Sequence, residues 1–327
     1  MENSKIREKF DFLFIIPMEE EFDTFTELIK FKYSKDFGSE IFYFLDLPNS
    51  NYNGIAVINF RKGISRALDV TRKALNLFDI RMVINMGIAG GLNDVLKLGD
   101  IVIPETVIHY QADSKARPKD KLDHSYKIEH SPKYYNTNHS LITCIQNFKY
   151  HELNLFKEFQ ENCSAFQVDL DLNEKLKRFI NIKPKYYVGK HASGDTVSAS
   201  KAFIDEIKAV DRNIISIDME SAGIYYVTSE FTKPIPTLMI RGITDLADDK
   251  KKDFDKIQGG IFRRYAMWNV VKFFLTLISA ISFQKRFSEI GLLRFPKELK
   301  LNESQKEIRD ILSQEPYRSK DPRRKYP

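Results

Sequence analysis

Residues 85–104 read NMGIAGGLNDVLKLGDIVIP and lie between two short apolar runs, Met82–Asn85 and Asp100–Ile103. Apolar runs of this length are typical of buried strands. The glycine-rich part, Gly87–Gly91, follows the first of these strands, as the phosphate-binding turn of a dinucleotide-binding fold does. It lacks the GxGxxG spacing that opens a helix, so the sequence does not predict a dinucleotide site.

On both sides of this segment, runs of β-branched and aromatic residues alternate with helical patterns. The other strands that we predict are Phe12–Ile16, Ile41–Leu45, Gly54–Phe60, Tyr186–Val188, Ile214–Ile217 and Thr237–Ile240. The helices that we predict from apolar residues three and four positions apart are Glu19–Phe31, Ser65–Phe78, Ser200–Val210 and Ser221–Phe231. This alternation predicts an α/β fold, a three-layer sandwich around a mixed central β-sheet.

The regular pattern ends with a predicted helix from about residue 261 to residue 282. We therefore predict one large α/β domain over residues 1–283, followed by a basic C-terminal extension over residues 284–327. The extension has few apolar residues to bury, so we expect it to add little to the packed core.

Between Tyr110 and Pro184 the alternation weakens, which indicates a long insertion. We expect it to begin as a polar loop over one face of the sheet. Helical segments should follow near Ser140–Phe148 and Leu172–Phe179. Long loops in compact domains are often binding elements, and we favour that interpretation here.

Composition excludes several classes of protein. Hydrophobic residues make up 43% of the chain and charged residues 29%, as expected for a globular protein with a core. Cys144, Cys163 and the six histidines show no metal-ligand spacing, so we predict neither a zinc site nor a disulfide framework. Two unpaired cysteines fit the reducing cytoplasm. The longest apolar run, Phe273–Phe283, is too short to span a bilayer, and the N-terminal segment has the pattern of a strand rather than a signal peptide.

The net charge of +6 is concentrated at one end of the chain. Residues 283–327 hold twelve Lys and Arg against seven Asp and Glu, so this tail carries +5 and the remainder only +1. A nearly neutral body does not indicate nucleic-acid binding. The basic tail is compatible with nucleic acid, an acidic partner or neither.

Polar segments follow several predicted strands, at the edge where open α/β sheets bind ligands. Besides residues 85–104, they are PMEEEF (17–22), ASGDTVSAS (192–200), IDMESAG (217–223) and IRGITDLAD (240–248). In this order and spacing they resemble the nucleoside phosphorylase superfamily, and within it the methylthioadenosine/S-adenosylhomocysteine nucleosidases. The resemblance runs from about Phe12 to Phe283, which is most of the chain.

The resemblance implies a role for each of three acids. Asp245 would protonate the leaving purine, Glu220 would bind the ribose hydroxyls, and Glu21 would hold the attacking water. These residue types suit the chemistry, because breaking a ribosyl C–N bond passes through an oxocarbenium-like state that needs an acid for the leaving base and a way to deliver water. Taken singly, acids at helix starts and turns are also common for structural reasons.

The resemblance also implies which residues surround the substrate, a purine that we expect to be adenine. Those expected to contact it are Ala89, Gly90, Val197, Ser198, Met219 and Arg241. Relatives usually carry an aromatic residue at the position of Val197, so the sequence leaves the identity of the substrate open. The family resemblance implies no metal and no cofactor, and it implies a homo-oligomer.

Phosphorolysis needs residues that bind a phosphate ion as the nucleophile, whereas hydrolysis needs only water. Asn85 and Ile88 stand where phosphorylases of this superfamily carry Arg and Ser. A phosphate dianion beside the glutamates of residues 19–21 would also be repelled in a partly dry site. The sequence therefore favours hydrolysis. A phosphate-dependent phosphorylase and a non-catalytic nucleotide-sensing module stay open as alternatives.

The SGDTVSAS form of the purine segment looks more like the phosphorylase-like domains of bacterial signalling and defence effectors, which often accept nucleotides. The cations that could hold a nucleotide phosphate are Arg61, Lys62, Arg66, Lys115, Arg117 and Arg241. Most of them, taken singly, are better interpreted as solvated surface charges. His109 and His191 follow predicted strands near the site, and we interpret both as structural.

Overall fold

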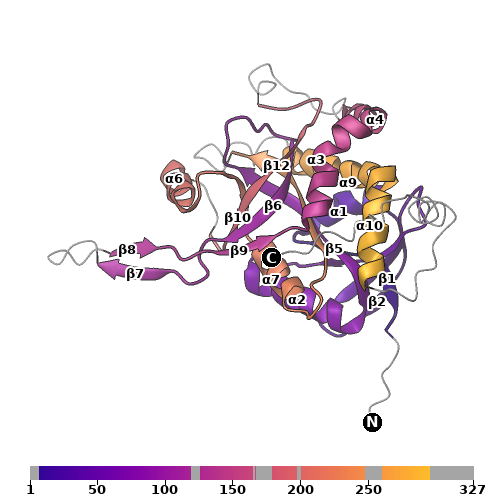
Figure 1. Cartoon of the computed structure of the whole chain (residues 1–327), viewed down its shortest axis with the longest axis horizontal. Coiled ribbons are helices and arrows are strands. Elements are labelled where there is room, and N and C mark those ends of the chain that lie inside the picture. The colour runs from indigo at the N-terminus through magenta and orange to yellow at the C-terminus, as the bar shows by residue number, and fades with distance from the viewer. Residues whose placement is uncertain are drawn as a thin grey trace, which may run out of the picture.

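The centre of the molecule is a mixed β-sheet of ten strands (Figure 1). The computed structural model describes residues 7–118, 126–164, 166, 179–196, 200–246 and 260–294. The strand order is β11-β10-β6-β12-β5-β1-β4-β3-β2, and β9 pairs with β6. The bounds of the ten strands are β1 (Lys9–Ile16), β2 (Phe31–Asp36), β3 (Ile41–Asp46), β4 (Asn53–Ile58), β5 (Asp79–Gly91), β6 (Ile101–His109), β9 (Lys133–Asn136), β10 (Tyr186–Ser193), β11 (Ile214–Asp218) and β12 (Thr237–Asp245).

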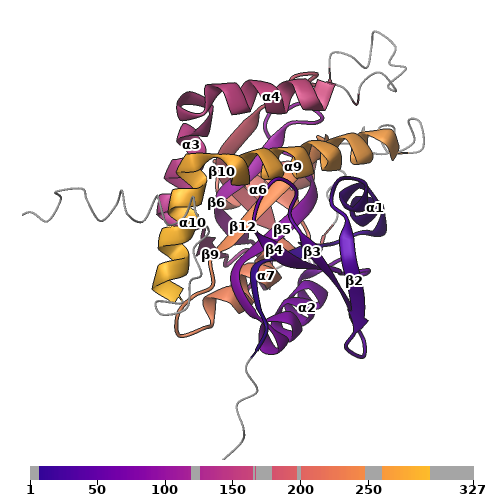
Figure 2. The same cartoon turned by 90° about the vertical axis from the view of Figure 1, so that its right-hand side faces the viewer.

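Helices cover both faces of this sheet, because its central strands bury side chains on both sides. In β1, Phe12 and Phe14 pack into one hydrophobic cluster while Leu13 and Ile15 pack into another. The first cluster is covered by α1 (Glu19–Leu28), α3 (His139–His151), α4 (Leu153–Ser164), α9 (Ile261–Ser279) and α10 (Ile281–Arg294). The second is covered by α2 (Ile64–Leu77) and α7 (Ser221–Ser229), which lie across the sheet from α9 (Figure 2). The predicted three-layer α/β sandwich is therefore confirmed.

Part of the sheet closes on itself. The C-terminal end of β5 pairs in parallel with β12 and also antiparallel with β11, where Ile217 lies opposite Gly90. Because β12, β6, β10 and β11 are joined in the same order, the five strands form a ring of pairings. The helix α6 (Lys201–Val210) packs Ile207 against β6, β10 and β11 on the outside of this ring. The closure brings the ends of β5, β11 and β12 together.

Most predicted elements are present, and the exceptions have physical reasons. The helix predicted over Glu19–Phe31 ends at Leu28, and the strand β2 follows it. This edge strand is exposed over nearly its whole length, so it has no apolar run that would mark it in the sequence. The helix predicted from about residue 261 to residue 282 is two helices, α9 and α10, that meet at Ala280.

The predicted insertion contains regular structure where we expected a polar loop over the sheet. A separate hairpin, β7 (Lys115–Pro118) and β8 (Tyr126–Glu129), projects away from the body of the molecule (Figure 1). The helix α3 confirms the helical segment expected near Ser140–Phe148. The second expected segment, Leu172–Phe179, falls largely outside the described residues.

The packed core extends past the boundary predicted at residue 283. The helix α10 buries Phe283, Phe287 and Ile290 in the same cluster as β1. The Phe287 ring stacks on Phe12 at 4.7 Å between centroids, and the Arg81 guanidinium lies 4.0 Å from its centre. The division between a domain and a basic extension therefore stays a prediction, with its boundary displaced to the end of α10 or beyond.

Among the described residues, no single helix is long and apolar enough to cross a bilayer. The pair α9 and α10 reaches the required length and composition together, but the two helices meet at 78°. Both pack against the sheet, and their apolar residues are part of the core described above.

Replacing Phe287 with Ala should lower the free energy of unfolding by about 3–5 kcal/mol, the usual range for removing a buried aromatic ring. The matched control is Ile281→Ala in the same helix, whose side chain is 68% exposed. That variant should stay within about 0.5 kcal/mol of the original protein. Chemical denaturation of both variants tests this, and equal, small losses would show that α10 is not part of the cooperative core.

Candidate active site

The ring of strands brings together the polar segments at the ends of β5, β11 and β12, which meet at Gly90. In the strand pairings, Gly90 lies opposite Ile217 of β11 and opposite Asp245 of β12. Glu220 follows β11 by two residues and ends up on the same side of the ring. Glu21 arrives from the neighbouring strand, because β1 runs parallel to β5 and α1 begins directly after it. The sheet topology therefore gathers the three predicted acids.

Glu21 is almost fully buried and is held by backbone donors from two elements. Its Oε2 accepts a hydrogen bond from the Met18 N–H at 3.0 Å, and its Oε1 accepts one from the Ile88 N–H at 2.9 Å. Burial raises the pKa of Glu21 to about 7, with Arg241 opposing that rise and Glu220 adding to it. A carboxylate with such a pKa can exchange a proton near neutral pH.

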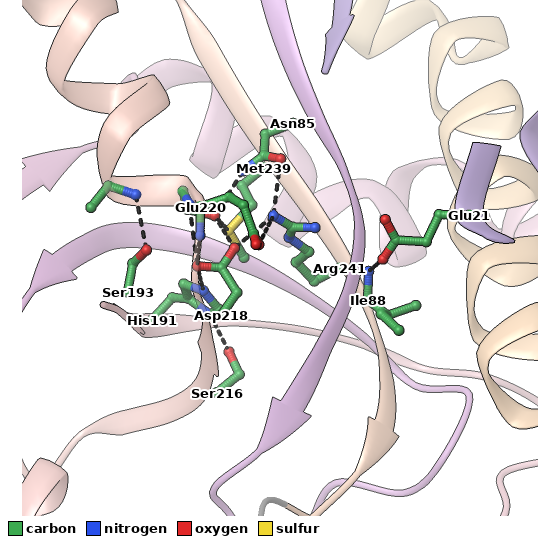
Figure 3. Close-up of polar contacts among 12 residues, drawn as sticks. Glu21, Asn85, Ile88, His191, Ser193, Ser216, Asp218, Glu220, Met239 and Arg241 are labelled. Atoms are coloured by element: carbon green, nitrogen blue, oxygen red, sulfur yellow. Dashed lines mark hydrogen bonds and ion pairs between the residues drawn. The ribbon is translucent and has the colours of Figure 1, made fainter. Parts of the chain in front are cut away.

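Arg241 lies between Glu21 on one side and Asp218 and Glu220 on the other (Figure 3). Its side chain is fully buried, with Nη2 2.7 Å from Asp218 Oδ2 and 3.7 Å from Glu220 Oε2. The same Nη2 donates to Asn85 Oδ1 at 3.0 Å. The predicted contact of Arg241 with the substrate stays a prediction; in the structure its guanidinium binds Asp218 and Asn85.

The approach of Arg241 depends on the glycine at position 87. A Cβ added there would lie 2.0 Å from Arg241 Nη1 and 3.1 Å from Glu21 Oε1. The guanidinium thus occupies the space that any larger residue would need. Within the described part of the chain, Nη1 has no hydrogen-bond partner, so it is a buried donor beside Glu21.

Asp218 is not among the predicted site residues, yet it takes part in many of the polar contacts of the site. Besides Arg241, it accepts hydrogen bonds from the backbone and hydroxyl of Ser221. His191 places Nε2 3.1 Å from Asp218 Oδ1, and its Nδ1 lies 2.7 Å from Ser216 Oγ. Burial alone would raise the pKa of Asp218, but the Arg241 guanidinium and His191 outweigh it and hold that pKa well below its usual range. Asp218 is therefore the permanently ionised member of the group.

Glu220 is buried beside this pair but is tied to a different element. Its Oε1 accepts a hydrogen bond from the Gly63 N–H at 3.3 Å, at the start of α2. Burial and the negative charge of Asp218 together raise the pKa of Glu220 to about 7, against the opposing effect of Arg241. Glu220 thus has an environment unlike that of Asp218, two residues earlier in the chain.

Asp245 stands at the end of β12 and is 3% exposed. The Thr244 hydroxyl donates to its Oδ2 at 3.1 Å. Its carboxyl group lines the same cavity as Glu21 and Glu220. The three acids therefore surround one space from three different elements: Glu21 from α1, Glu220 from the start of α7 and Asp245 from the end of β12.

This space is a cavity of about 220 Å³. The predicted site residues that line it are Glu21, Ala89, Gly90, Met219, Glu220 and Asp245. Val197 and Ser198, which we expected to line the purine, lie outside the described residues. The other residues that line the cavity are Pro17, Met18, Lys62, Ile88, Thr196, Ile217, Asp218, Thr244 and Arg263. Asp218 is one of these residues. Its position, as a polar residue at the end of an apolar strand, is the sequence signal that could have identified it.

The candidate phosphate-binding cations are mostly elsewhere, and only Lys62 lines the cavity. Arg66 pairs with Glu40 at 2.8 Å, and Lys115 and Arg117 belong to the projecting hairpin. His191 is buried behind Asp218, and His109 does not line the cavity.

The family model described as "Phosphorylase superfamily" matches residues 11–263, which include all the acids of the cavity. The chain belongs to the phosphorylase superfamily.

Curated relatives carry nucleosidase names. The chain is 29% identical to the 5′-methylthioadenosine/S-adenosylhomocysteine nucleosidase of Buchnera aphidicola over 55% of this chain and 61% of that enzyme. It is 25% identical to the enzyme of the same name from Bacillus velezensis over 73% of this chain and 90% of that enzyme. It is 24% identical to the ATP nucleosidase Cap17 of Escherichia coli, over 61% of this chain and only 37% of that longer protein.

Solved structures support the superfamily fold. The 5′-methylthioadenosine/S-adenosylhomocysteine nucleosidase of Neisseria meningitidis, in complex with methylthio-immucillin-A, has a TM-score of 0.58 at 20% identity, covering 81% of this chain and 97% of that chain. Futalosine hydrolase of Helicobacter pylori has a TM-score of 0.57 at 20% identity, covering 83% of this chain and 97% of that chain.

The raised pKa of Glu21 has a consequence for stability. Because that pKa is about 7 in the folded chain against 4.5 for a free glutamate, the native state holds more protons than the unfolded state between these values. Glu21 should therefore lower the free energy of unfolding as the pH rises from 4.5 to 7, by on the order of 1–3 kcal/mol. Glu21→Gln should remove that part of the pH dependence.

Calorimetry from pH 4.5 to pH 8 measures this effect as the difference in melting temperature between Glu21→Gln and the original protein. As the pH rises, the melting temperature of the variant should increase relative to that of the original protein. The exposed neighbour provides the control, and Glu19→Gln should leave the pH dependence unchanged. A constant difference for Glu21→Gln across this range would mean that Glu21 titrates like a solvated glutamate.

Proposed function

We propose that this protein hydrolyses the N-glycosidic bond of a purine nucleoside or nucleotide and releases the free base. The observation that carries the proposal is one cavity that is lined by three buried acids, Glu21, Glu220 and Asp245, each held by a different element. The nucleosidase names of the relatives from Buchnera, Bacillus and Escherichia coli support the same reaction. Their names also support adenine as the base.

The leaving base requires an acid, and we assign that role to Asp245, which lines the cavity. Protonation of a purine ring nitrogen by Asp245 would let the C1′–N bond break with its electron pair leaving on the base. Positive charge then builds on the ribose ring. Glu220, in contact with the ribose hydroxyls, would stabilise that charge most strongly in the transition state, because a charged acceptor gains strength as the sugar becomes cationic.

Water must then reach C1′ and lose a proton. Glu21 has a pKa of about 7, so near neutral pH its carboxylate can accept that proton while it orients the water. Arg241 lies beside Glu21 without lining the cavity, and its positive charge favours the ionised form of the Glu21 carboxylate that accepts the proton. The net reaction adds water across the C1′–N bond and leaves the base and a free sugar hydroxyl.

Charge favours water over phosphate as the nucleophile. Glu21, Asp218, Glu220 and Asp245 all line the cavity, and Arg241, a buried cation beside them, is already engaged by Asp218. Asn85 donates to Ser221 and accepts from Arg241, so it is committed to the protein. A phosphate dianion at the attacking position would meet uncompensated negative charge, whereas water is neutral.

The names of the relatives give weaker support for a cellular role than they give for the reaction. The similarity to ATP nucleosidase Cap17 supports a role in depleting nucleotides. We extend the proposal to bacterial signalling or defence from the form of the purine segment. We expect the protein to act in the cytoplasm as a homo-oligomer. Gel filtration with light scattering tests the expected assembly.

The reaction is tested by incubating the protein with a panel of purine nucleosides and nucleotides, with and without phosphate, and separating the products by chromatography. We expect free base and a free sugar or sugar phosphate in both conditions. Dependence on added phosphate, with a 1-phosphorylated sugar as product, would establish phosphorolysis in place of hydrolysis.

Asp245→Asn tests the proposed acid, because the amide keeps the size of the side chain but has no proton to transfer. Turnover should fall by about 100-fold or more, the usual scale for a general acid, while substrate binding survives. Single-turnover rates and equilibrium binding, measured together, separate the two effects. Near-normal turnover in this variant would remove Asp245 from the mechanism.

A further inference from the structure

Lys62 lies at the sugar side of the cavity. It lines the cavity from the loop between β4 and α2, and the next residue, Gly63, donates its N–H to Glu220. Under the proposed function Glu220 contacts the ribose hydroxyls, whereas Asp245 contacts the base. Lys62 therefore lies beside the residue proposed to bind the sugar.

Its charge is not neutralised by the protein. Within the described ranges, no ion pair or hydrogen bond engages the Lys62 ammonium, although Arg66 one turn later is paired with Glu40 and with the Asn59 carbonyl. Arg61, directly before Lys62, is exposed and does not line the cavity. Lys62 is thus the cation of this loop that is available to a ligand in the cavity.

The loop that carries Lys62 has a fixed shape. The Asn59 N–H donates to the Ile16 carbonyl at 2.9 Å, which ties the start of the loop to β1. Phe60 then adopts a φ of 53° and Gly63 a φ of 114°; residues other than glycine rarely adopt positive φ values of this kind. Strained backbone of this kind is concentrated at ligand sites, because the surrounding structure must hold it in place.

A second cation lines the cavity from α9. Arg263 pairs with Glu20 at 3.2 Å, so part of its charge is shared, and its side chain is 25% exposed. The carboxylates of the cavity are buried, whereas Lys62 is exposed, so negative charge is concentrated at the floor and positive charge towards solvent. A ligand that matches this polarity is neutral at its reacting end and anionic at the other.

We propose that Lys62 binds the 5′-phosphate of the substrate, so that the site takes a purine nucleotide in preference to a nucleoside. This inference rests on the proposed function, because Glu220 marks the sugar only if it binds ribose. The 5′-phosphate is attached directly to the sugar, so it stays within reach of a cation adjacent to the ribose site. A neutral thioether at the 5′ position would leave the Lys62 charge without a partner.

An anionic carboxylate, as in the aminoacyl tail of S-adenosylhomocysteine, offers related chemistry. We favour phosphate for two reasons. A phosphate is dianionic near neutral pH, whereas that tail carries an amine that cancels its carboxylate charge. A phosphate also needs no flexible chain to be ordered before it reaches the cation.

The test compares kcat/KM for AMP, ATP, adenosine, methylthioadenosine and S-adenosylhomocysteine in the original protein and in Lys62→Met, Lys62→Arg and Arg61→Met. The original protein should prefer a nucleotide over adenosine by about tenfold or more, the size of one charge-assisted hydrogen bond. Lys62→Met should lower the ratio of nucleotide to adenosine by about the same factor. Lys62→Arg should keep most of it, and Arg61→Met should leave both the ratio and the activity unchanged.

Three results would overturn the inference. One is a nucleotide-to-adenosine ratio that is the same in Lys62→Met and the original protein. Another is a loss of equal size in Arg61→Met, which would indicate a general electrostatic effect. The third is a preference for S-adenosylhomocysteine that Lys62→Met abolishes, which would assign the cation to a carboxylate.

Equilibrium binding separates this inference from the proposed function. If no compound releases its base, the proposed hydrolysis fails, and the affinities of AMP and adenosine still report on Lys62. Tighter binding of AMP that depends on Lys62 would support the phosphate site without the reaction. Equal affinities in the original protein and Lys62→Met would reject the site. Unchanged melting temperatures of the variants confirm that all are folded.

Discussion

The buried guanidinium of Arg241 is the charge on which the whole site depends. It is fully buried among carboxylates, and removing it would leave several negative charges uncompensated in the interior, a strongly destabilising change. Its position also divides the acids. Asp218, 2.7 Å away, stays ionised, whereas Glu220 at 3.7 Å and Glu21, which is held by backbone donors, have pKa values of about 7. Residues of one chemical type thus become a fixed anion and two titratable groups.

That arrangement needs a particular backbone around it. Gly87 leaves the space that the guanidinium fills, and the pairing of β5 with both β11 and β12 brings the acids to it. An ordinary open sheet would leave the ends of β11 and β5 apart. The pairing of β11 with β5 that closes the ring places residues more than a hundred positions apart in the chain opposite each other, as with Ile217 and Gly90. The site is therefore a property of the closed sheet and not of any single motif.

The sequence was sufficient for features that local pattern and motif determine. The alternation of strands and helices predicted the layers, and the family motifs predicted the three acids that line the cavity. Asp218 was missed because an acid at the end of a strand looks like a simple turn residue until its partners arrive from distant segments. The same limit applies to Arg241, whose role depends on burial, and to the pairing of β11 with β5, which no local signal specifies. The strand β2 and the hairpin strands are polar and exposed, so hydrophobic pattern could not reveal them.

The start of α2 links the two halves of the cavity. Two consecutive backbone N–H groups there bind carboxylates from different strands: Gly63 binds Glu220, and Ile64 binds Asp195 at 2.8 Å. Asp195 leads into the segment expected to cover the purine, whereas Glu220 is proposed to bind the sugar. A small tilt of this one helix would stretch both hydrogen bonds together. The contacts proposed for the base and those proposed for the sugar therefore depend on the position of the same helix. A displacement that weakens the binding of one end of the bound molecule would also weaken the binding of the other.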